Sequence, residues 1–588
     1  MYKYAGQGGA VRAAVTAVLA ALGLTAAIWV AAGDSARAAS ADTVLRNGTV
    51  LTMDKKDSVA SAVAIRKGRI VYTGTDRGVR KWIGKNTKVM NLKGATAMPG
   101  MVDGHAHPLL GGDVIDDCDL GNIEATIPEL LAVMTECDQA DPAKDNSDWL
   151  KVSNWNPVGV LPQGTVVTRQ DLDTAFPNRP IYIQGSDFHN SWVNSRALEI
   201  AGITSETPNP PNGEFVRDEL GNPTGLLKDG AQRIVRASIP PKPFDEAVAD
   251  GLRGIKAMNA TGITTTAESV AEPDSFKVWK ELNRTGKLSI RMNSFPAIGS
   301  EETADQAWKD YRDLQREFEG GRLRLPGIKL VLDGVIEYPA QTAALLKPYL
   351  MEDGGQWVPG NNRGELYHSN AQTNALVKLF DQKKRLIHMH AIGDRAARQG
   401  LNAAAVARKA NHSAKRLNIS IGHLQLVDPA DYPRFRKLGV IANMQLQWAI
   451  SNFWTEEALR PYIGEQRYKR MYPAHSLVAA GAPFSMGSDW PVDPLNPWRE
   501  IMTARTRSSS YGGPLNPSQG ISLKRALKAH TMGAAVQLGL GKKIGSLEPG
   551  KFADIVVVDR NPLKAKVSSI ENTKVLRTMV QGETVYKP

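Results

Sequence analysis

The chain has very few cysteines and no long runs of charge. Only two of its 588 residues are cysteine, so one disulfide at most can form. The formal net charge is +12, but lysine and arginine are scattered along the chain rather than gathered with aromatic residues into basic segments. This pattern argues against nucleic-acid binding and favours a solvated basic surface.

One long apolar stretch lies near the N-terminus. Residues 13–32 follow Lys3 and Arg12 and precede Ala36-Arg-Ala38, which has the small-X-small pattern of a signal peptidase site. No twin-arginine pair and no cysteine for lipidation accompany it. We predict a signal peptide over residues 1–38 and export to the periplasm or the medium, with no stable membrane insertion after cleavage. Because the stretch is long enough to span a bilayer, membrane anchoring is the alternative if cleavage fails.

Export would change the chemistry of the two cysteines. Cys118 and Cys137 flank an amphipathic segment over residues 123–135. In an oxidising compartment they can form a disulfide that closes a short loop. The alternative is a pair of buried thiols.

Short strands with turn residues occupy both ends of the chain after the leader. The Asn47-Gly48 and Lys67-Gly68 steps each lie between two strand-like runs, so we predict a hairpin turn at each. The whole chain, with 588 residues and 42% hydrophobic content, is long enough for a large core and for more than one simple domain.

A short apolar strand ends in His105-Ala-His107. Side chains alternate along a strand, so both imidazoles point the same way and can bind one metal ion. An isolated His-X-His pair also occurs on ordinary half-buried strands. Here, however, further ligand-type residues end separate apolar runs, namely Lys329, His390, His423 and Asp489.

Helical stretches separate these runs, which indicates a parallel α/β fold with its chemistry at the C-terminal strand ends. Eight barrel strands are predicted, at 98–102, 262–268, 288–294, 328–332, 386–389, 419–421, 440–444 and 483–486. The interval from residue 108 to about 241 is too long for one crossover, so it holds an inserted subdomain.

Four segments together resemble the amidohydrolase superfamily, most closely its N-substituted formamide deformylase-like branch: residues 99–107, 390–396, 487–492 and 545–554. The resemblance implies a TIM-like (β/α)8 barrel over residues 98–540, with the insertion covering the mouth of the site. It also implies a small β-sandwich built from residues 39–97 and 541–588. A homodimer is an assembly that the family often forms.

The resemblance also assigns the ligands. His105 and His107 would bind one divalent metal, His390 and His423 a second, and zinc suits these neutral imidazoles. Lys329 beside two dications should lose its proton and add carbon dioxide, forming the bridging carbamate that the family uses. The alternative is a lysine that extends to solvent. His388 shares a face with His390, and we place it one layer deeper because His390 adjoins the family motif.

Asp489 is the predicted general acid/base, which accepts a proton from activated water and returns it to the leaving amine. His189, Trp192, Tyr338 and Trp490 are predicted to contact the substrate, although His189 could equally be a structural loop residue and the aromatic residues could pack the barrel rim. We predict an exported hydrolase that cleaves a C–N bond in an N-substituted amide or formamide, a small-molecule substrate. Esters, lactones or a deaminated ring are the alternatives, and a non-catalytic binding protein is a more distant one.

Overall fold

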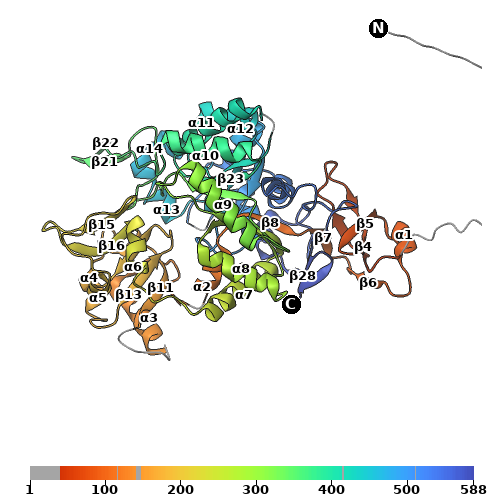
Figure 1. Cartoon of the computed structure of the whole chain (residues 1–588), viewed down its shortest axis with the longest axis horizontal. Helices are drawn as coiled ribbons and strands as arrows, with labels where there is room; N and C mark the ends of the chain where they lie inside the picture. The colour runs from red at the N-terminus through yellow and green to blue at the C-terminus, as the bar shows by residue number, and fades with distance from the viewer. Residues whose placement is uncertain (1–39, 116, 141–147, 414–415, 510) are drawn as a thin grey trace, which may run out of the picture. The chain divides into compact units, whose positions relative to one another are not determined.

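The computed structural model describes residues 40–115, 117–140, 148–413, 416–509 and 511–588. The predicted signal peptide lies outside these residues. The described part is a mixed α/β structure (Figure 1). No helix in it combines the length and the apolar character that crossing a bilayer requires.

Parallel strands form the centre of the molecule in two sheets, with orders β19-β18-β17-β8 and β20-β23-β24-β25-β26. Their bounds are β8 Met101–Ala106, β17 Ile263–Ala271, β18 Arg291–Pro296, β19 Leu323–Arg324, β20 Gly327–Val331, β23 Leu386–Ala391, β24 Ile419–His423, β25 Val440–Met444 and β26 Phe484–Met486. A single bridge between Ala297 and Lys329 joins the two sheets on one side. On the other side, no ladder of described residues pairs β26 with β8, but the amide of Asp489 donates to the carbonyl of His105 over 2.7 Å.

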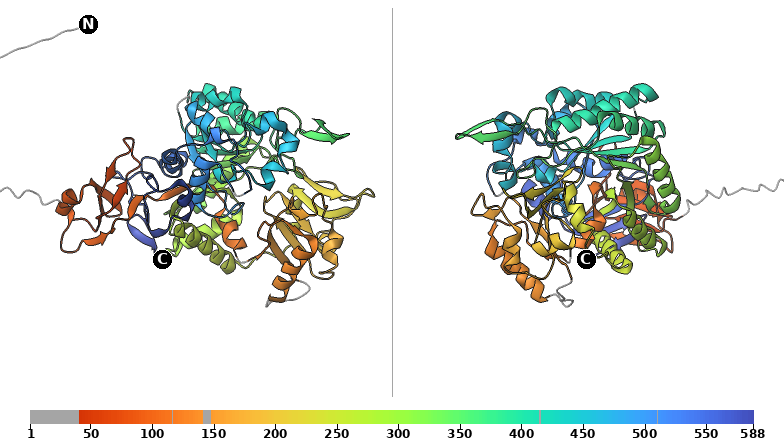
Figure 2. Two further views of the ribbon diagram at one scale, coloured as in Figure 1. Left: turned by 180° about the vertical axis from the view of Figure 1, so that it is seen from behind. Right: turned by 60° about the vertical axis from the view of Figure 1, so that its left-hand side comes forward.

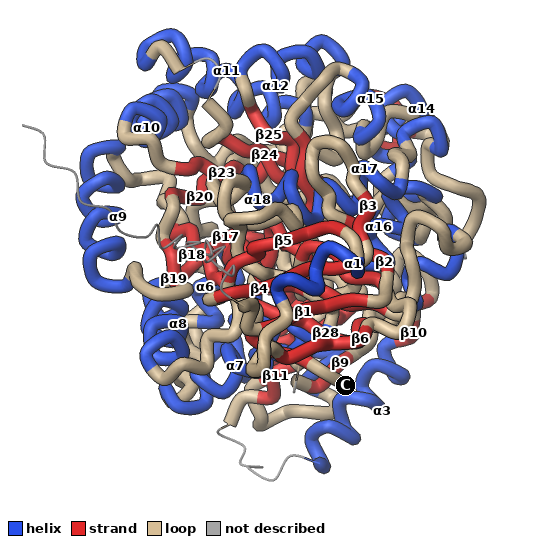
Figure 3. The backbone as a smooth tube through the Cα atoms, turned by 90° about the vertical axis from the view of Figure 1, so that its right-hand side faces the viewer, coloured by secondary structure: helices blue, strands red, loops and turns tan. Residues whose placement is uncertain are grey.

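Helices cover these strands from outside (Figure 3). The main ones are α7 Phe244–Ala260, α8 Pro273–Arg284, α9 Ala304–Phe318, α10 Asn370–Gln382, α11 Asp394–Asn411, α12 Tyr432–Leu438, α15 Ala474–Ala479, α16 Pro497–Thr506, α17 Leu523–Lys528 and α18 Ala534–Gln537. Between them and the strands lies one continuous apolar core, whose residues include Met101, Trp279 and Phe380. Shorter elements complete this part: α2 Pro108–Val114, α13 Phe453–Glu456, α14 Arg460–Tyr468 and the hairpin β21 Leu350–Asp353 with β22 Gln356–Pro359.

The first predicted barrel strand, 98–102, proves to be wrong in its bounds. The chain forms β7 over Thr96–Pro99, which pairs with the C-terminal part of the chain, and begins β8 only at Met101. The break falls at Gly100, where an added Cβ would lie 2.3 Å from a Thr264 side-chain atom. Strand β17 therefore approaches the backbone there too closely for any side chain.

Strands from both chain ends pair in one sheet, in the order β29-β28-β27-β7-β2-β3. A second sheet, β5-β4-β1-β6, comes from the N-terminal end alone. The bounds are β1 Thr43–Arg46, β2 Thr49–Leu51, β3 Val59–Ala60, β4 Ala62–Arg66, β5 Arg69–Gly74, β6 Lys88–Asn91, β27 Ile555–Val558, β28 Val575–Val580 and β29 Glu583–Tyr586, with α1 Asp76–Val79 after β5.

One of the two predicted hairpin turns is confirmed. Lys67 and Gly68 both adopt positive φ between the antiparallel strands β4 and β5, as a tight hairpin turn requires. The prediction at Asn47-Gly48 is wrong, because β1 and β2 belong to different sheets. An Asn-Gly step permits the same positive φ at a bend between sheets, so the dipeptide alone does not specify strand pairing.

The segment after α2 forms its own six-stranded sheet, β15-β16-β14-β13-β11-β9 (Figures 1 and 2). The bounds are β9 Cys118–Asp119, β11 Leu150–Trp155, β13 Ile181–Gly185, β14 Asn190–Val193, β15 Gly213–Arg217 and β16 Pro223–Asp229. The helices are α3 Ile127–Ala140, α4 Arg169–Asp173, α5 Ser195–Ile200 and α6 Gly230–Arg236; a short pair, β10 Ala125–Thr126 and β12 Val160–Leu161, precedes α4. Two separate apolar clusters, containing Trp155 and Phe215 respectively, form its core.

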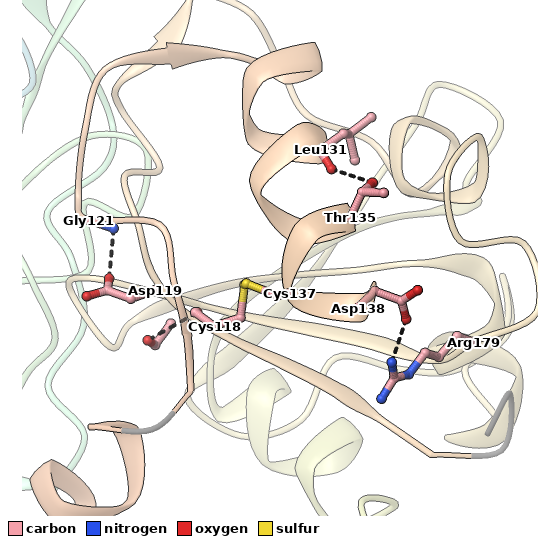
Figure 4. The surroundings of a disulfide bond; sticks show 9 residues. Cys118, Asp119, Gly121, Leu131, Thr135, Cys137, Asp138 and Arg179 are labelled. Carbon is pink, nitrogen blue, oxygen red and sulfur yellow. Dashed lines mark hydrogen bonds and ion pairs between the residues drawn. A yellow bond between two sulfur atoms is a disulfide. The ribbon is translucent and has the colours of Figure 1, made fainter. Parts of the chain in front are cut away.

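The predicted disulfide is present. Cys118 at the sheet edge and Cys137 in α3 are bonded, with their Cα atoms 5.8 Å apart (Figure 4). The bond joins α3 to the edge strand β9, and nearby Arg179 and Asp138 form a buried ion pair between the same helix and the sheet.

Candidate metal centre

The strand ends bring the predicted ligands together. The Lys329 amine, on β20, lies 3.3 Å from Nε2 of His105, on β8. One carboxylate oxygen of Asp489 lies 3.0 Å from Nε2 of His107 and 3.3 Å from Nε2 of His105. His105 lies in β8 and His107 directly follows it at the start of α2, and both imidazoles point toward the same carboxylate.

His423 is the most informative member of this cluster. Its side chain is 2% exposed, yet neither of its ring nitrogens has a hydrogen-bond partner in the described structure. One ligand atom each from His105, His423 and Asp489 lie within 4.8 Å of one another. Buried polar atoms are normally satisfied, so the unpartnered nitrogens indicate that a ligand such as a metal ion belongs there.

His390 is held from behind by a carboxylate. Its Nδ1 lies 3.1 Å from Asp333, which also accepts the backbone amides of Ala344, Ile392 and Gly393. The ring of His390 lies 4.4 Å from that of His423, centroid to centroid. A fixed Nδ1 leaves Nε2 to face the cluster, which is a common arrangement behind metal-binding histidines.

His388 lies behind His105 rather than beside His390. Its Nε2 is 2.8 Å from Nδ1 of His105, and its Nδ1 is 2.8 Å from the hydroxyl of Ser420. If Nε2 of His105 is to offer a lone pair to a metal, Nδ1 must carry the proton and donate it to His388. His388 then accepts at Nε2 and donates from Nδ1 to Ser420, so this chain sets the tautomer of His105.

Burial keeps the nitrogen donors of the cluster uncharged. It lowers the pKa of His105 and His423 well below the usual value, and neighbouring basic groups lower both further. Burial also lowers the pKa of Lys329 to about 7, although the charge of Asp489 acts in the opposite direction. Lys329 is 1% exposed, which excludes the alternative of a side chain reaching solvent. Neutral imidazoles, a near-neutral amine and a carboxylate fit a divalent metal.

The backbone is strained at two of these residues. His423 and Asp489 adopt φ of 72° and 54°, in the left-handed region that non-glycine residues rarely occupy. Buried Asp103 fixes the Asp489 segment to β8, because it accepts hydrogen bonds from the amides of both His105 and Ser488 and from the Ser488 hydroxyl. Strain held in place by surrounding contacts is common where side chains must point at a functional site.

His189 enters the site from the sheet of the inserted segment. Its ring lies 6.2 Å from that of His390, and its Nδ1 is hydrogen-bonded to Asp229. Burial alone would lower its pKa, but the charge of Asp229 and this hydrogen bond raise the pKa of His189 to about 9. The His189–Asp229 pair of the inserted segment therefore faces the His390–Asp333 pair of the parallel strands.

The three aromatic residues predicted to contact the substrate lie elsewhere or pack against other elements. Trp192 is enclosed in the core of the inserted segment beside Trp155, and its indole donates to a backbone carbonyl, so the prediction for it is wrong. Tyr338 is 45% exposed and stacks on Tyr462; among the described residues it makes no hydrogen bond or ring contact with the histidines. Trp490 is 7% exposed and packs against Gly111 in α2, while its carbonyl accepts the amide of His107. The sequence showed their ring types but not the direction of their side chains.

The sequence did not single out two carboxylates that hold histidines of the site. Asp333 is fully buried behind His390, and its place at the end of the apolar run at 327–334 was the available signal. Asp229 holds His189 from a strand with no motif, so nothing in the sequence marked it. Trp448 stacks on His423 with ring centroids 5.5 Å apart.

Known proteins are similar to this chain in both sequence and fold. The model of the amidohydrolase family matches residues 88–586. An N-substituted formamide deformylase from Arthrobacter pascens is 26% identical over 569 residues, covering 93% of this chain and 98% of that protein. LONG AFTER FAR-RED 3 from Arabidopsis thaliana is 29% identical over 561 residues, covering 93% and 92%.

A crystal structure of an uncharacterized metal-dependent hydrolase from Pyrococcus horikoshii is similar with a TM-score of 0.69 and 24% identity, covering 90% of this chain and 99% of that one. This likeness shows the shared fold.

Proposed function

The chain belongs to the amidohydrolase family, and from that premise we propose that it is exported and hydrolyses the C–N bond of an N-substituted amide or formamide. Membership makes it a metal-dependent hydrolase acting on C–N bonds. The cluster of buried, uncharged nitrogen donors around Asp489 supports this reaction most directly. The similarity to a formamide deformylase over nearly the whole chain supports the choice of substrate class.

The proposed ligands are those of the strand ends. His105, His107 and Asp489 would hold one zinc-like ion, and His390 and His423 would hold a second. When bound, divalent ions supply the Lewis acidity that activates water and polarises a carbonyl group. We further propose that the parallel strands of the two central sheets close into a barrel, which would place every ligand at its C-terminal face. The hydrogen bond between the Asp489 amide and the His105 carbonyl supports that closure.

Lys329 is proposed to become a carbamate, whose oxygens would serve as further metal ligands. Its amine is uncharged in a large fraction of molecules near neutral pH, because burial has lowered its pKa to about 7. The free amine adds carbon dioxide at Nζ and releases one proton, giving a carbamate anion. That anion suits two dications where an ammonium would be repelled.

Asp489 is proposed to carry the proton. Asp489 is 5% exposed, and its carboxylate contacts His105 of β8 and His107, which follows that strand. It can accept a proton from the attacking water and then donate it to the nitrogen of the leaving amine. His189 lies on the opposite side of the site, where it faces His390 and is proposed to contact the substrate.

The first test is metal content and hydrolysis of the full chain. We expect close to two zinc-like ions per chain, a mass increase of one carbon dioxide under gentle conditions, and release of formate and amine from N-substituted formamides. Chelation should abolish the reaction and added zinc should restore it. Turnover of esters, lactones or ring amines with no formamide cleavage would overturn the substrate class.

A second test addresses export. N-terminal sequencing of mature protein from the producing cell should begin at residue 39, with cleavage after Ala38. Intact Met1 on protein recovered from membranes would support the anchored form instead.

A further inference from the structure

Two polar residues in the segments that follow strands β20 and β24 each carry an acceptor oxygen and are joined by a hydrogen bond. Gln425 follows strand β24 by two residues, and Glu337 follows Asp333 by four. Both therefore come from segments that lead away from the ends of strands in the candidate metal centre. The amide nitrogen of Gln425 donates to Glu337 over 3.2 Å and to the hydroxyl of Tyr472 over 2.8 Å.

The other end of the Gln425 amide has no partner. Gln425 is 4% exposed, and its Oε1 is buried without a hydrogen bond in the described structure. Reversing the amide would place Oε1 against the carboxylate of Glu337, where two acceptors would repel each other. The unpartnered atom is therefore an acceptor, and a buried acceptor of this kind costs free energy until a donor reaches it.

Glu337 has no cationic partner of its own. Among the residues that the structure describes, no lysine or arginine lies within ion-pair distance of its carboxylate, and its only side-chain hydrogen bond is the one from Gln425. Burial raises its pKa, and the charge of nearby Asp187 raises it further. His189 lowers it, but the charge of His189 is already offset by its direct hydrogen bond to Asp229.

We propose that Glu337 and Oε1 of Gln425 form a subsite for a primary ammonium group on the substrate. An ammonium offers three N–H donors and one positive charge, which match a carboxylate and an unpartnered amide oxygen. A resident metal ion fits less well, because calcium or magnesium requires about six oxygen ligands, and Glu337, Gln425 and Tyr472 are the only three described side chains in this hydrogen-bonded group that offer oxygens. This inference rests on the proposed amide hydrolysis and narrows its substrates to those with an amino group on the N-substituent.

Binding can be measured without turnover. Isothermal titration of the metal-loaded full chain with n-butylammonium should show binding at least ten-fold tighter than with butanol. The Glu337→Gln variant keeps the shape and the hydrogen bond but loses the charge, so it should lose that preference. Glu352→Gln, at an exposed glutamate on β21, is the matched control and should keep it within two-fold. Equal binding of the cation and the alcohol by the unaltered protein would overturn the subsite.

Hydrolysis provides an independent test of the ammonium subsite. The enzyme should cleave N-aminobutylformamide at least ten-fold more efficiently than N-pentylformamide, and Glu337→Gln should lose the difference through KM. An equal loss on both substrates would overturn the subsite. Ammonium binding without cleavage of either formamide would overturn the proposed hydrolysis and leave the subsite standing. If Glu337→Gln is not folded, Gln425→Leu provides the second variant, with the same loss of preference expected.

Discussion

At the residue scale, the site depends on side chains whose protons are fixed by their neighbours. Asp489 touches His105 and His107, whereas Asp333 and His388 hold ligands from behind. Asp489 and His388 therefore have different roles: Asp489 is proposed to carry the proton, and His388 sets the tautomer of His105. Separate substitutions can test each role.

Asp489→Asn should keep the fold and the bound metal while lowering kcat/KM by about 10²–10⁴, because an amide cannot carry the proton. Steady-state kinetics on a formamide substrate, together with metal analysis, checks this. Activity unchanged from the parent enzyme would rule Asp489 out as the proton carrier.

His388→Leu should weaken metal binding by about 10–100-fold, because Nδ1 of His105 loses its acceptor and the ring loses its orientation. Competition with a chelator measures the affinity. His368→Leu is the control, since that histidine is equally buried but bonds to Gln372 in another part of the chain. Equal effects of the two substitutions would mean that His388 serves packing alone.

At the element scale, buried polar side chains join strands to their covering helices. Glu268 on β17 accepts hydrogen bonds from Trp279 on α8 and from Ser294 on β18. Burial raises the pKa of this carboxyl to about 7, despite those hydrogen bonds. The folded state therefore binds the proton of Glu268 more tightly than the unfolded chain does.

This carboxyl stabilises the fold when protonated, so its contribution is complete below about pH 4.5 and is lost as the pH rises toward 7. Glu268→Gln stays neutral, so the unfolding free energy of the variant, relative to that of the parent, should rise by about 2.5 kcal/mol between pH 5 and pH 8. Urea denaturation of both proteins at each pH measures the difference. Glu272→Gln, at an exposed position just after β17, should show no such gain. Parallel pH profiles for Glu268→Gln and the parent would contradict the assignment.

The disulfide is a second link between elements, because it joins α3 to strand β9. Replacing both Cys118 and Cys137 by serine should lower the unfolding free energy of the inserted segment by about 3 kcal/mol, because the bond closes a loop of 19 residues in the unfolded chain. Chemical denaturation with and without a reductant tests this. Reductant should destabilise the parent to the level of the double variant and leave the variant unchanged; a parent insensitive to reductant would speak against the bond.

At the scale of the whole molecule, an ion pair ties the C-terminal strands to the parallel strands. Arg291 on β18 makes two hydrogen bonds to Asp554, at 2.9 and 3.2 Å, and Asp554 also accepts the amide of Gln581. Both charged side chains are nearly buried. The pair therefore joins residues that are more than 250 positions apart in sequence.

Asp554→Ala should destabilise the protein by about 3–5 kcal/mol, because it leaves the charge of Arg291 buried and unpaired. Asp559→Ala removes an exposed partner of Arg560 at the other end of β27 and should cost about 1 kcal/mol or less. Thermal and denaturant unfolding of the two variants compares them. Similar losses would mean that the Arg291 pair contributes no more than a surface ion pair.

The sequence by itself determined the family, the parallel strands and the identity of the ligand-type residues. Each of these is local: an apolar run of strand length followed by His105, Lys329, His423 or Asp489 is visible without knowing where the chain goes. The disulfide could also be predicted from the sequence, because two cysteines allow only one bond. The Lys67-Gly68 turn followed from the backbone preferences of two residues.

Only the tertiary structure decided which side chains meet. That Asp333 lies behind His390, that Asp229 holds His189, and that Trp192 is enclosed all depend on contacts between distant segments. The Asn47-Gly48 bend and the break at Gly100 were likewise set by the sheet that each strand joined. The physical reason is the same in each case: residue type fixes what a side chain can bond to, but packing of the whole chain fixes what lies within its reach.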